Sequence, residues 1–263
     1  MNQLRLGGVS YLNARPLTWA LDRSGTQWLV RYDVPSVCAE LLARGDIDLG
    51  LVSSIEYLRS PRYRFVPGVG IWTRGPVISV ALYTRVPLGD IRRVAVDTSS
   101  RTSVALLRIL CVRHFGIEPV FVPHPPDLAA MLADADAALL IGDPAFEADH
   151  AGLGAQKFDL GEEWTKMTGL PFVYAAWTGP TGPVTAAHVE ALQAAQEEGR
   201  RQFPAIAREY GGDDPVTVAR AEAYLRDNLR YGLGPDEAAG LQLFLDYAVE
   251  VGAAPMRRRL EFF

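Results

Sequence analysis

Residues 28–54 read WLVRYDVPSVCAELLARGDIDLGLVSS. The extended run at 28–34 predicts a strand, and the apolar spacing at 36–43 predicts a helix that ends at Gly45, a residue type common just after the last helical turn. The apolar run at 47–52 then predicts a buried strand. This order of strand, helix and strand is typical of parallel strands joined by a crossover helix.

The residues before this unit extend the same pattern. An extended run at 4–9 predicts another strand. Pro16 stands where the first turn of a helix tolerates proline, and residues 17–21 carry that helix forward. The first part of the chain therefore predicts a βαβαβ arrangement and a parallel sheet.

A second α/β unit lies between residues 92 and 141. Its apolar runs predict strands at 93–96, 119–122 and 137–141, and its amphipathic spacing predicts a helix at 102–114. Because each unit can form its own sheet and core, two units predict two lobes.

Two segments, 77–83 and 172–177, flank the second unit. Both are apolar and free of turn residues, as expected for two strands that cross from one lobe to the other. We therefore predict a double hinge.

Three helical patterns follow, at 183–203, 215–231 and 235–251, each with a proline near its start. We expect them to pack on the first lobe. The first lobe then comprises residues 1–83 and 178–263, and the second comprises residues 84–177. The predicted fold is α/β, with two lobes, a double hinge and a central ligand cleft, which is the type II periplasmic-binding-protein architecture.

The composition favours a small molecule as the partner. The chain is 49% hydrophobic and 22% charged, with a net charge of -5, and its 26 basic and 31 acidic residues argue against a nucleic-acid or membrane partner. Cys38 and Cys111 stand apart in helical patterns, so we expect buried thiols rather than a disulfide or a zinc site. The start of the sequence lacks the pattern of an export signal, which predicts a cytoplasmic protein.

Two loops of the first lobe offer polar side chains where strands end, the usual place for a ligand in this kind of fold. The loop at 9–17 carries Ser10, Tyr11, Asn13 and Arg15, and the alternative interpretation is a helix cap with one core tyrosine. The loop at 52–57 is a second candidate. It carries Ser53, Ser54 and Glu56, and here a serine could cap a helix and Glu56 could be a favourable charge in its first turn.

Two loops of the second lobe complete the predicted site. Ser99, Ser100, Arg101, Thr102 and Ser103 begin a helix, and hydroxyl groups with free N–H groups at a helix start favour an anion such as a carboxylate. Helix capping explains one or two of these hydroxyl groups but not all of them.

The last loop is 140–145. Gly142 allows close approach of the backbone to a ligand, and Asp143 either faces the cleft or caps the next helix.

Histidine chemistry is doubtful because the four histidines fall outside these loops. The sequence also lacks a GxGxxG motif, a Walker loop and a metal-ligand cluster. We therefore expect no cofactor and no metal.

Several motifs resemble those of the chorismate dehydratases of the futalosine route to menaquinone. They are VSYLNARPL at 9–17, GDIDLGLVSSIEY at 45–57, SRTSV at 100–104, LIGDPA at 140–145, and Trp164 followed by GLPFV at 169–173. The first motif is the most specific. One departure is Ser53, where the family often has proline.

The resemblance implies a hydro-lyase that converts chorismate to 3-[(1-carboxyvinyl)oxy]benzoate without a cofactor, acting as a monomer or weak homodimer. It implies that Asn13, Ser10 and Ser100 are catalytic. The substrate-binding residues that it implies are Tyr11, Arg15, Ser53, Ser54, Glu56, Ser99, Arg101, Thr102, Ser103, Gly142 and Asp143. The alternatives are a solute-binding protein, the effector domain of a transcription regulator, and the sister enzyme acting later in the same pathway.

Overall fold

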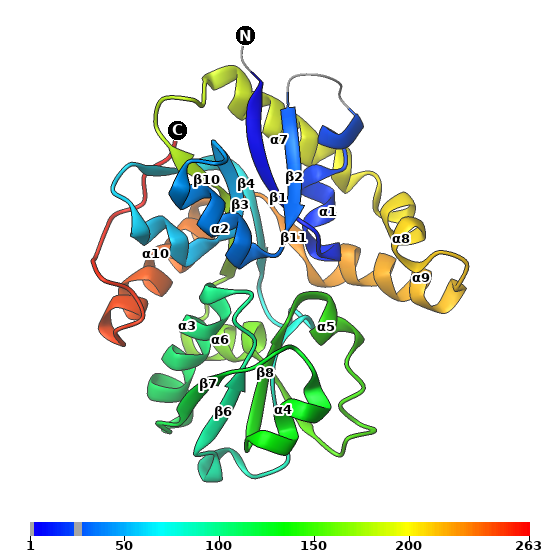
Figure 1. The fold of residues 1–263 in the computed structure, drawn as a ribbon, viewed down its shortest axis with the longest axis vertical. Helices are drawn as coiled ribbons and strands as arrows, with labels where there is room; N and C mark the ends of the chain where they lie inside the picture. Colours follow the sequence, from blue (N-terminus) through cyan, green and yellow to red (C-terminus); the bar gives the residue numbers. More distant parts are fainter. Residues whose placement is uncertain (1–2, 24–27) are drawn as a thin grey trace.

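The computed structural model describes residues 3–23 and 28–263, which form two lobes, each built around one β-sheet (Figure 1). Residues 1–2, with which the predicted first lobe begins, lie outside the described residues. The α/β, two-lobed architecture predicted from the sequence is confirmed.

The first lobe contains a six-stranded sheet in the order β11-β4-β10-β3-β1-β2. Its strands are β1 (Leu4–Val9), β2 (Trp28–Asp33), β3 (Leu49–Ser53), β4 (Tyr63–Thr73), β10 (Phe172–Pro180) and β11 (Arg230–Tyr231). β1 pairs in parallel with both β2 and β3, so the predicted βαβαβ unit is confirmed. The sheet as a whole is mixed, because β10 runs antiparallel between β3 and β4.

The helices of the first lobe are α1 (Arg15–Thr18), α2 (Pro35–Arg44), α7 (Ala186–Arg200), α8 (Phe203–Gly211), α9 (Pro215–Ala223) and α10 (Pro235–Glu250). Shorter turns are the 3-10 helices η1 (Leu12–Ala14), η2 (Leu21–Arg23) and η3 (Ser54–Arg59), and the π-helix η6 (Tyr224–Asn228). Gly45 ends α2 with φ 77°, as predicted.

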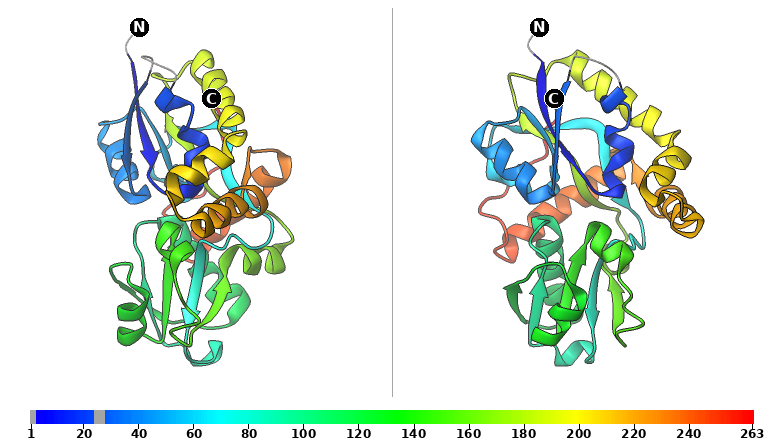
Figure 2. Two further views of the ribbon diagram at one scale, coloured as in Figure 1. Left: turned by 90° about the vertical axis from the view of Figure 1, so that its right-hand side faces the viewer. Right: turned by 45° about the vertical axis from the view of Figure 1, so that its right-hand side comes forward.

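Two of the three C-terminal helical patterns end three residues earlier than predicted. The first stops at Arg200, and the unpredicted helix α8 begins at Phe203 with Pro204 in its first turn, where the missing N–H is tolerated. The second stops at Asn228, because Tyr231 pairs with Ile71 at the edge of the sheet. Figure 2 shows α8 and α9 along the junction of the two lobes.

The second lobe contains a five-stranded sheet in the order β7-β6-β8-β5-β9. Its elements are β5 (Val80–Thr84), η4 (Leu88–Asp90), β6 (Arg93–Val96), α3 (Arg101–Leu110), η5 (Cys111–Phe115), β7 (Val120–Pro123), α4 (Leu128–Asp134), β8 (Ala137–Ile141), α5 (Gly142–Glu147), β9 (Gln156–Asp159) and α6 (Leu160–Thr168). β6 pairs in parallel with β7 and β8, and the predicted strands at 93–96 and 137–141 have the bounds expected.

The crossings between the lobes lie a few residues before the predicted ones. β5 belongs to the second sheet and β10 to the first, so the chain crosses at 74–79 and again at 169–171. Residues 80–83 therefore belong to the second lobe and residues 172–177 to the first. The prediction was wrong here because a strand buried on both faces has the same continuous apolar sequence whether it crosses between lobes or lies inside a sheet.

The first crossing is held in an unusual backbone conformation. Ile78 has φ 69°, a left-handed value that is rare for a β-branched residue. The Asp159 carboxylate accepts hydrogen bonds from the backbone N–H groups of Val77 and Ile78, the latter at 2.6 Å. Lys157 Nζ donates to the Ile78 carbonyl oxygen at 2.7 Å. Both side chains come from the end of β9, so the second lobe holds residues 77 and 78 in place.

Candidate active site

A small cavity of about 40 Å³ lies between the lobes. It is lined by Val9, Tyr11, Asn13, Ala14, Pro35, Leu51, Ser53, Ile71, Tyr174 and Ala175 of the first lobe and by Val80, Ser100, Ser103, Ile141 and Gly142 of the second. Six of the predicted site residues are among them, and the rest of the wall is largely apolar.

Three hydroxyl groups meet where the two lobes touch. Ser53 is the last residue of β3 and Ser100 caps α3, and their Oγ atoms lie 3.1 Å apart across the lobes. Ser103 Oγ donates to Ser100 Oγ at 3.1 Å. The predicted hydroxyl-rich helix start therefore faces the cavity through Ser100 and Ser103.

Tyr11 and Gly142 lie against each other across the same cavity. Gly142 has φ 64°, and a β-carbon at this position would lie 2.7 Å from the Tyr11 ring. The Tyr11 hydroxyl donates to Ser99 Oγ at 3.3 Å. Glycine is needed here both for its backbone conformation and for the close approach of the ring.

Asn13 lies in η1, the short turn that follows β1, and it is half-buried at the cavity. Its backbone carbonyl oxygen accepts a hydrogen bond of 3.0 Å from the Tyr231 hydroxyl. No sequence pattern indicated a role for Tyr231, since it falls at the end of a pattern that predicted an ordinary helix.

Ser54 and Thr102 contact each other rather than the cavity. Their hydroxyl oxygens lie 3.3 Å apart, and Thr102 Oγ1 accepts a hydrogen bond of 3.0 Å from the Ile55 backbone N–H. Ser54 Oγ donates to the Val173 carbonyl oxygen at 2.8 Å. Both residues are fully buried, so in this closed arrangement they join the lobes.

Asp143 also joins the lobes. Its Oδ1 accepts a hydrogen bond of 3.0 Å from the Leu12 backbone N–H, next to Asn13. Burial raises the pKa of this carboxyl to about 6, although the hydrogen bond from Leu12 favours the charged form. The capping alternative for Asp143 is wrong, because α5 begins after Ile141 and has no side-chain cap.

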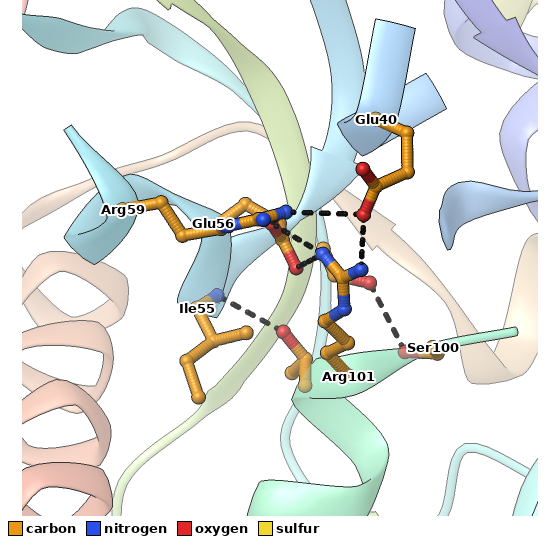
Figure 3. A network of polar contacts seen from close by, with 8 residues as sticks. Glu40, Ile55, Glu56, Arg59, Ser100 and Arg101 are labelled. Carbon is orange, nitrogen blue, oxygen red and sulfur yellow. Dashed lines mark hydrogen bonds and ion pairs between the residues drawn. The ribbon is translucent and has the colours of Figure 1, made fainter. Parts of the chain in front are cut away.

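Glu56 and Arg101 lie in a separate outer groove of about 920 Å³. Arg101 Nη1 donates to both Glu56 carboxylate oxygens, at 3.2 and 3.1 Å, and its Nη2 pairs with Glu40. Arg59 Nη1 lies 3.1 Å from Glu56 Oε2 (Figure 3). Glu56 and Arg101 thus line this groove and not the small cavity, and their role in substrate binding stays a prediction. Arg101 leaves the helix in a different direction from Ser100, and only 3% of the Glu56 side chain is exposed because the two arginines cover it.

Two predicted residues of the first loop point away from the cavity. Ser10 is exposed, and Arg15 pairs with Asp22 and Glu209, at 3.4 and 3.6 Å. The loop turns into η1 between Tyr11 and Ala14, so only its middle residues face the second lobe.

The profile of a protein family described as menaquinone biosynthesis matches residues 4–250, nearly the whole chain. The chain belongs to this menaquinone-biosynthesis family. A relative named chorismate dehydratase, from Thermus thermophilus, is 32% identical over 95% of this chain and 97% of its own length.

Solved structures with lower sequence identity to this family member share its fold. A protein of Archaeoglobus fulgidus has a TM-score of 0.73 at 19% identity, over 95% of this chain and 98% of its own. The periplasmic aliphatic sulphonate binding protein SsuA of Escherichia coli has a TM-score of 0.68 at 19% identity, over 98% and 90%. The predicted periplasmic-binding-protein-like architecture is confirmed.

Within residues 3–23 and 28–263, no group of three or more His, Cys, Asp or Glu side chains is arranged to hold a metal ion. Burial raises the pKa of the Cys38 and Cys111 thiols to about 12, so both are protonated near neutral pH.

No helix in the described part of the chain has the length and hydrophobicity to span a membrane.

Proposed function

We propose that this family member is a hydro-lyase that dehydrates chorismate to 3-[(1-carboxyvinyl)oxy]benzoate, the first step of the futalosine route to menaquinone. One observation carries the proposal: the cavity between the lobes gathers the Asn13 amide and the hydroxyl groups of Ser53, Ser100 and Ser103 against an apolar wall. The chorismate dehydratase of Thermus thermophilus supports it.

The reaction suits neutral groups. A ring C–H bond and the bond from the ring to the neighbouring hydroxyl break, the C–H electron pair forms the new ring double bond, and the proton and hydroxide leave as water. The ring becomes aromatic, so the elimination is strongly downhill. The protein has to hold the reactive conformer, exclude water and assist the leaving hydroxyl.

The substrate carboxylates need donors. The start of α3 offers N–H groups at the positive end of a ten-residue helix, together with the hydroxyl groups of Ser100 and Ser103 at the cavity. We assign one carboxylate to this helix start and the reacting region of the ring to Asn13. We assign the remaining polar groups to Ser53, whose Oγ lies 3.1 Å from that of Ser100.

The base is proposed to be the substrate itself. Asp143 is the protein carboxylate whose pKa, about 6, would suit proton transfer near neutral pH. However, its Oδ1 is bonded to the Leu12 N–H, and Asp143 is absent from the cavity wall. The carboxylate on the enolpyruvyl arm of chorismate can fold over the ring and take the proton instead.

Incubation of the protein with chorismate tests the function. Loss of the ultraviolet absorbance of chorismate, together with a product lighter by one water, is the expected result. Binding of chorismate without turnover would favour the solute-binding alternative, and no interaction at all would favour the sister enzyme of the pathway, which acts on a later intermediate.

We further propose that the protein acts in the cytoplasm, as a monomer or weak homodimer. The mass measured by light scattering over a range of protein concentrations tests the oligomeric state, and a stable tetramer would contradict it.

A further inference from the structure

Four charged side chains meet at the outer groove, where the two lobes face each other (Figure 3). They are Glu40 of α2, Glu56 and Arg59 of η3, and Arg101 at the start of α3. Arg101 Nη1 donates to both carboxylate oxygens of Glu56, and its Nη2 pairs with Glu40. Arg101 is the member that belongs to the second lobe, so both of its ion pairs join the lobes.

Arg59 belongs to the same lobe as the two acidic side chains. It follows Glu56 by three residues on the same short helix, and its Nη1 lies 3.1 Å from Glu56 Oε2 and 3.5 Å from Glu40 Oε1. The first lobe therefore contributes two carboxylates and one arginine, with a net charge of -1, and Arg101 makes the cluster neutral. This part of the first lobe thus attracts one positive charge from the second lobe.

The burial of Glu56 strengthens its ion pair with Arg101. Only 3% of the Glu56 side chain is exposed, whereas 39% of the Arg101 side chain is. A charged hydrogen bond to a group shielded from water is stronger than one between exposed groups, which contributes little. If the lobes separate, Glu56 keeps Arg59 as a partner. Its pair with Arg101 can therefore break without leaving a buried carboxylate unpaired.

Arg101 follows directly after one of the residues at the cavity. Ser100 caps α3, and its Oγ lies 3.1 Å from Ser53 Oγ across the lobes (Figure 3). Ser103 Oγ donates to Ser100 Oγ at 3.1 Å. Because Arg101 is the next residue in the chain, its ion pairs with the first lobe also hold this helix start at the cavity.

The cavity is smaller than the substrate of the proposed reaction requires. Its volume is about 40 Å³, and pockets for small molecules hold about 300 to 1,000 Å³. We therefore expect the lobes to separate before chorismate binds and to close over it afterwards. The ion pairs of Arg101 should break in the first step and form again in the second.

We propose that Arg101 is a positioning residue that latches the closed state: its ion pairs with Glu56 and Glu40 hold Ser100 against Ser53 once the lobes have closed over the substrate. This inference rests on the proposed function. In this role Arg101 makes no contact with the substrate, since it lines the outer groove and not the cavity.

Arg101→Gln removes the charge and both cross-lobe ion pairs. The dissociation constant of the reaction product, 3-[(1-carboxyvinyl)oxy]benzoate, should rise by about 5- to 30-fold, and KM for chorismate should rise with it. We expect kcat to change by less than about twofold, because the latch holds the ground state and the transition state alike. Calorimetric titration and steady-state kinetics of the full chain measure these values, and an unchanged dissociation constant would overturn the latch.

Arg108→Gln is the matched control. Arg108 lies on the same helix and lines the same groove, but its guanidinium lies over the Phe121 ring of the second lobe, 4.8 Å from the ring centroid. The variant removes an equal charge and leaves the ion pairs of Arg101 in place. It should bind the product as the wild type does. An equal rise of the dissociation constant in both variants would indicate general attraction of an anionic ligand and would overturn the latch.

Glu56→Gln separates the latch from direct contact between Arg101 and the substrate. If Glu56 is part of the latch, the dissociation constant of the product should rise by about threefold or more, with little change in kcat. If Arg101 bound the substrate itself, loss of Glu56 would free its guanidinium for the ligand. Tighter or unchanged binding in Glu56→Gln would therefore overturn the inference.

A double variant tests whether Glu56 acts through Arg101. Adding Glu56→Gln to Arg101→Gln should change the dissociation constant of the product by less than about twofold, because the ion pair is already lost. The same loss of affinity from Glu56→Gln in both backgrounds would overturn the latch.

The two proposals fail in different ways. A wild-type protein that neither binds the product nor converts chorismate would overturn the proposed function and the latch with it. Wild-type turnover of chorismate, combined with wild-type affinity in Arg101→Gln, would leave the proposed function standing and overturn only the latch.

Glu40→Gln is the second probe, and it decides the matter if Arg101→Gln does not fold. Glu40 is exposed on α2 and pairs with Arg101 from the first lobe. Its loss should raise the dissociation constant of the product by about twofold or more and leave kcat nearly unchanged. An unchanged dissociation constant in Glu40→Gln would overturn the latch.

Discussion

Variants of three single residues, Asn13, Asp143 and Glu56, test which group acts as the base in the reaction. Asn13 lies at the cavity, Asp143 receives a hydrogen bond from Leu12, and Glu56 is paired with two arginines outside the cavity. If the substrate supplies the base, Glu56→Gln and Asp143→Asn should keep most of the wild-type turnover and Asn13→Leu should lose most of it. A protein base would contribute about 10²- to 10⁴-fold, so its loss would be plain in single-turnover rates. A collapse in Asp143→Asn with binding preserved would make Asp143 the base.

The pKa of Asp143 has a consequence for stability. Burial raises it to about 6, above the value of about 3.9 in an unfolded chain. From about pH 4 to pH 6 the folded protein thus holds a proton that the unfolded chain has lost, and this group lowers the free energy of unfolding as the pH rises, by at most about 3 kcal/mol. Asp143→Asn should lack this fall. Denaturant unfolding of both proteins across this pH range measures the fall. A difference in unfolding free energy between the two proteins that does not change with pH would contradict the prediction.

At the scale of one element, the start of α3 has two faces with different roles. Ser103 lines the cavity and bonds Ser100, whereas Thr102 accepts the Ile55 N–H across the lobes. Ser103→Ala should weaken the binding of an unreactive substrate analogue by about 1 to 3 kcal/mol with little change in unfolding. Thr102→Ala should instead lower the free energy of unfolding by about 1 to 3 kcal/mol, because it leaves a buried N–H without a partner. Calorimetric titration and denaturant unfolding measure the two effects. Weaker analogue binding by Thr102→Ala, with unchanged unfolding, would show that Thr102 binds the substrate.

The same helix shows how far sequence patterns reach. Hydroxyl groups at a helix start predicted that the start of α3 belongs to the site, and strands such as β1, β6 and β8 have the predicted bounds. The pattern could not tell that Arg101 turns toward Glu56, because the direction of a side chain depends on which partner the fold brings near. Tyr231, whose hydroxyl donates to the Asn13 carbonyl oxygen, lies 218 residues after Asn13, and no local pattern links them.

At the scale of the whole molecule, the small volume of the cavity implies that the two lobes move apart to admit the substrate. Pockets that enclose ligands of this size hold about 300 to 1,000 Å³, and the cavity between the lobes is about 40 Å³. We therefore expect substrate to enter by separation of the lobes, which, among the described residues, are connected by 74–79 and 169–171. Small-angle scattering should give a larger radius of gyration for the free protein than for its complex with an unreactive analogue. An unchanged radius despite confirmed binding would contradict hinge closure.

The left-handed Ile78 decides which part of the first crossing can bend. Asp159 and Lys157 fasten residues 77 and 78 to the second lobe, and the Gly75 N–H donates to Thr165 Oγ1 of α6 at 2.8 Å, so residues 75–78 should move together with the second lobe. Ser79 lies directly after this stretch. The hydroxyl of Tyr224, a residue of the first lobe, donates to Ser79 Oγ at 2.6 Å. When the lobes separate, these two hydroxyl groups should move apart, so the hydrogen bond between them forms as the lobes close.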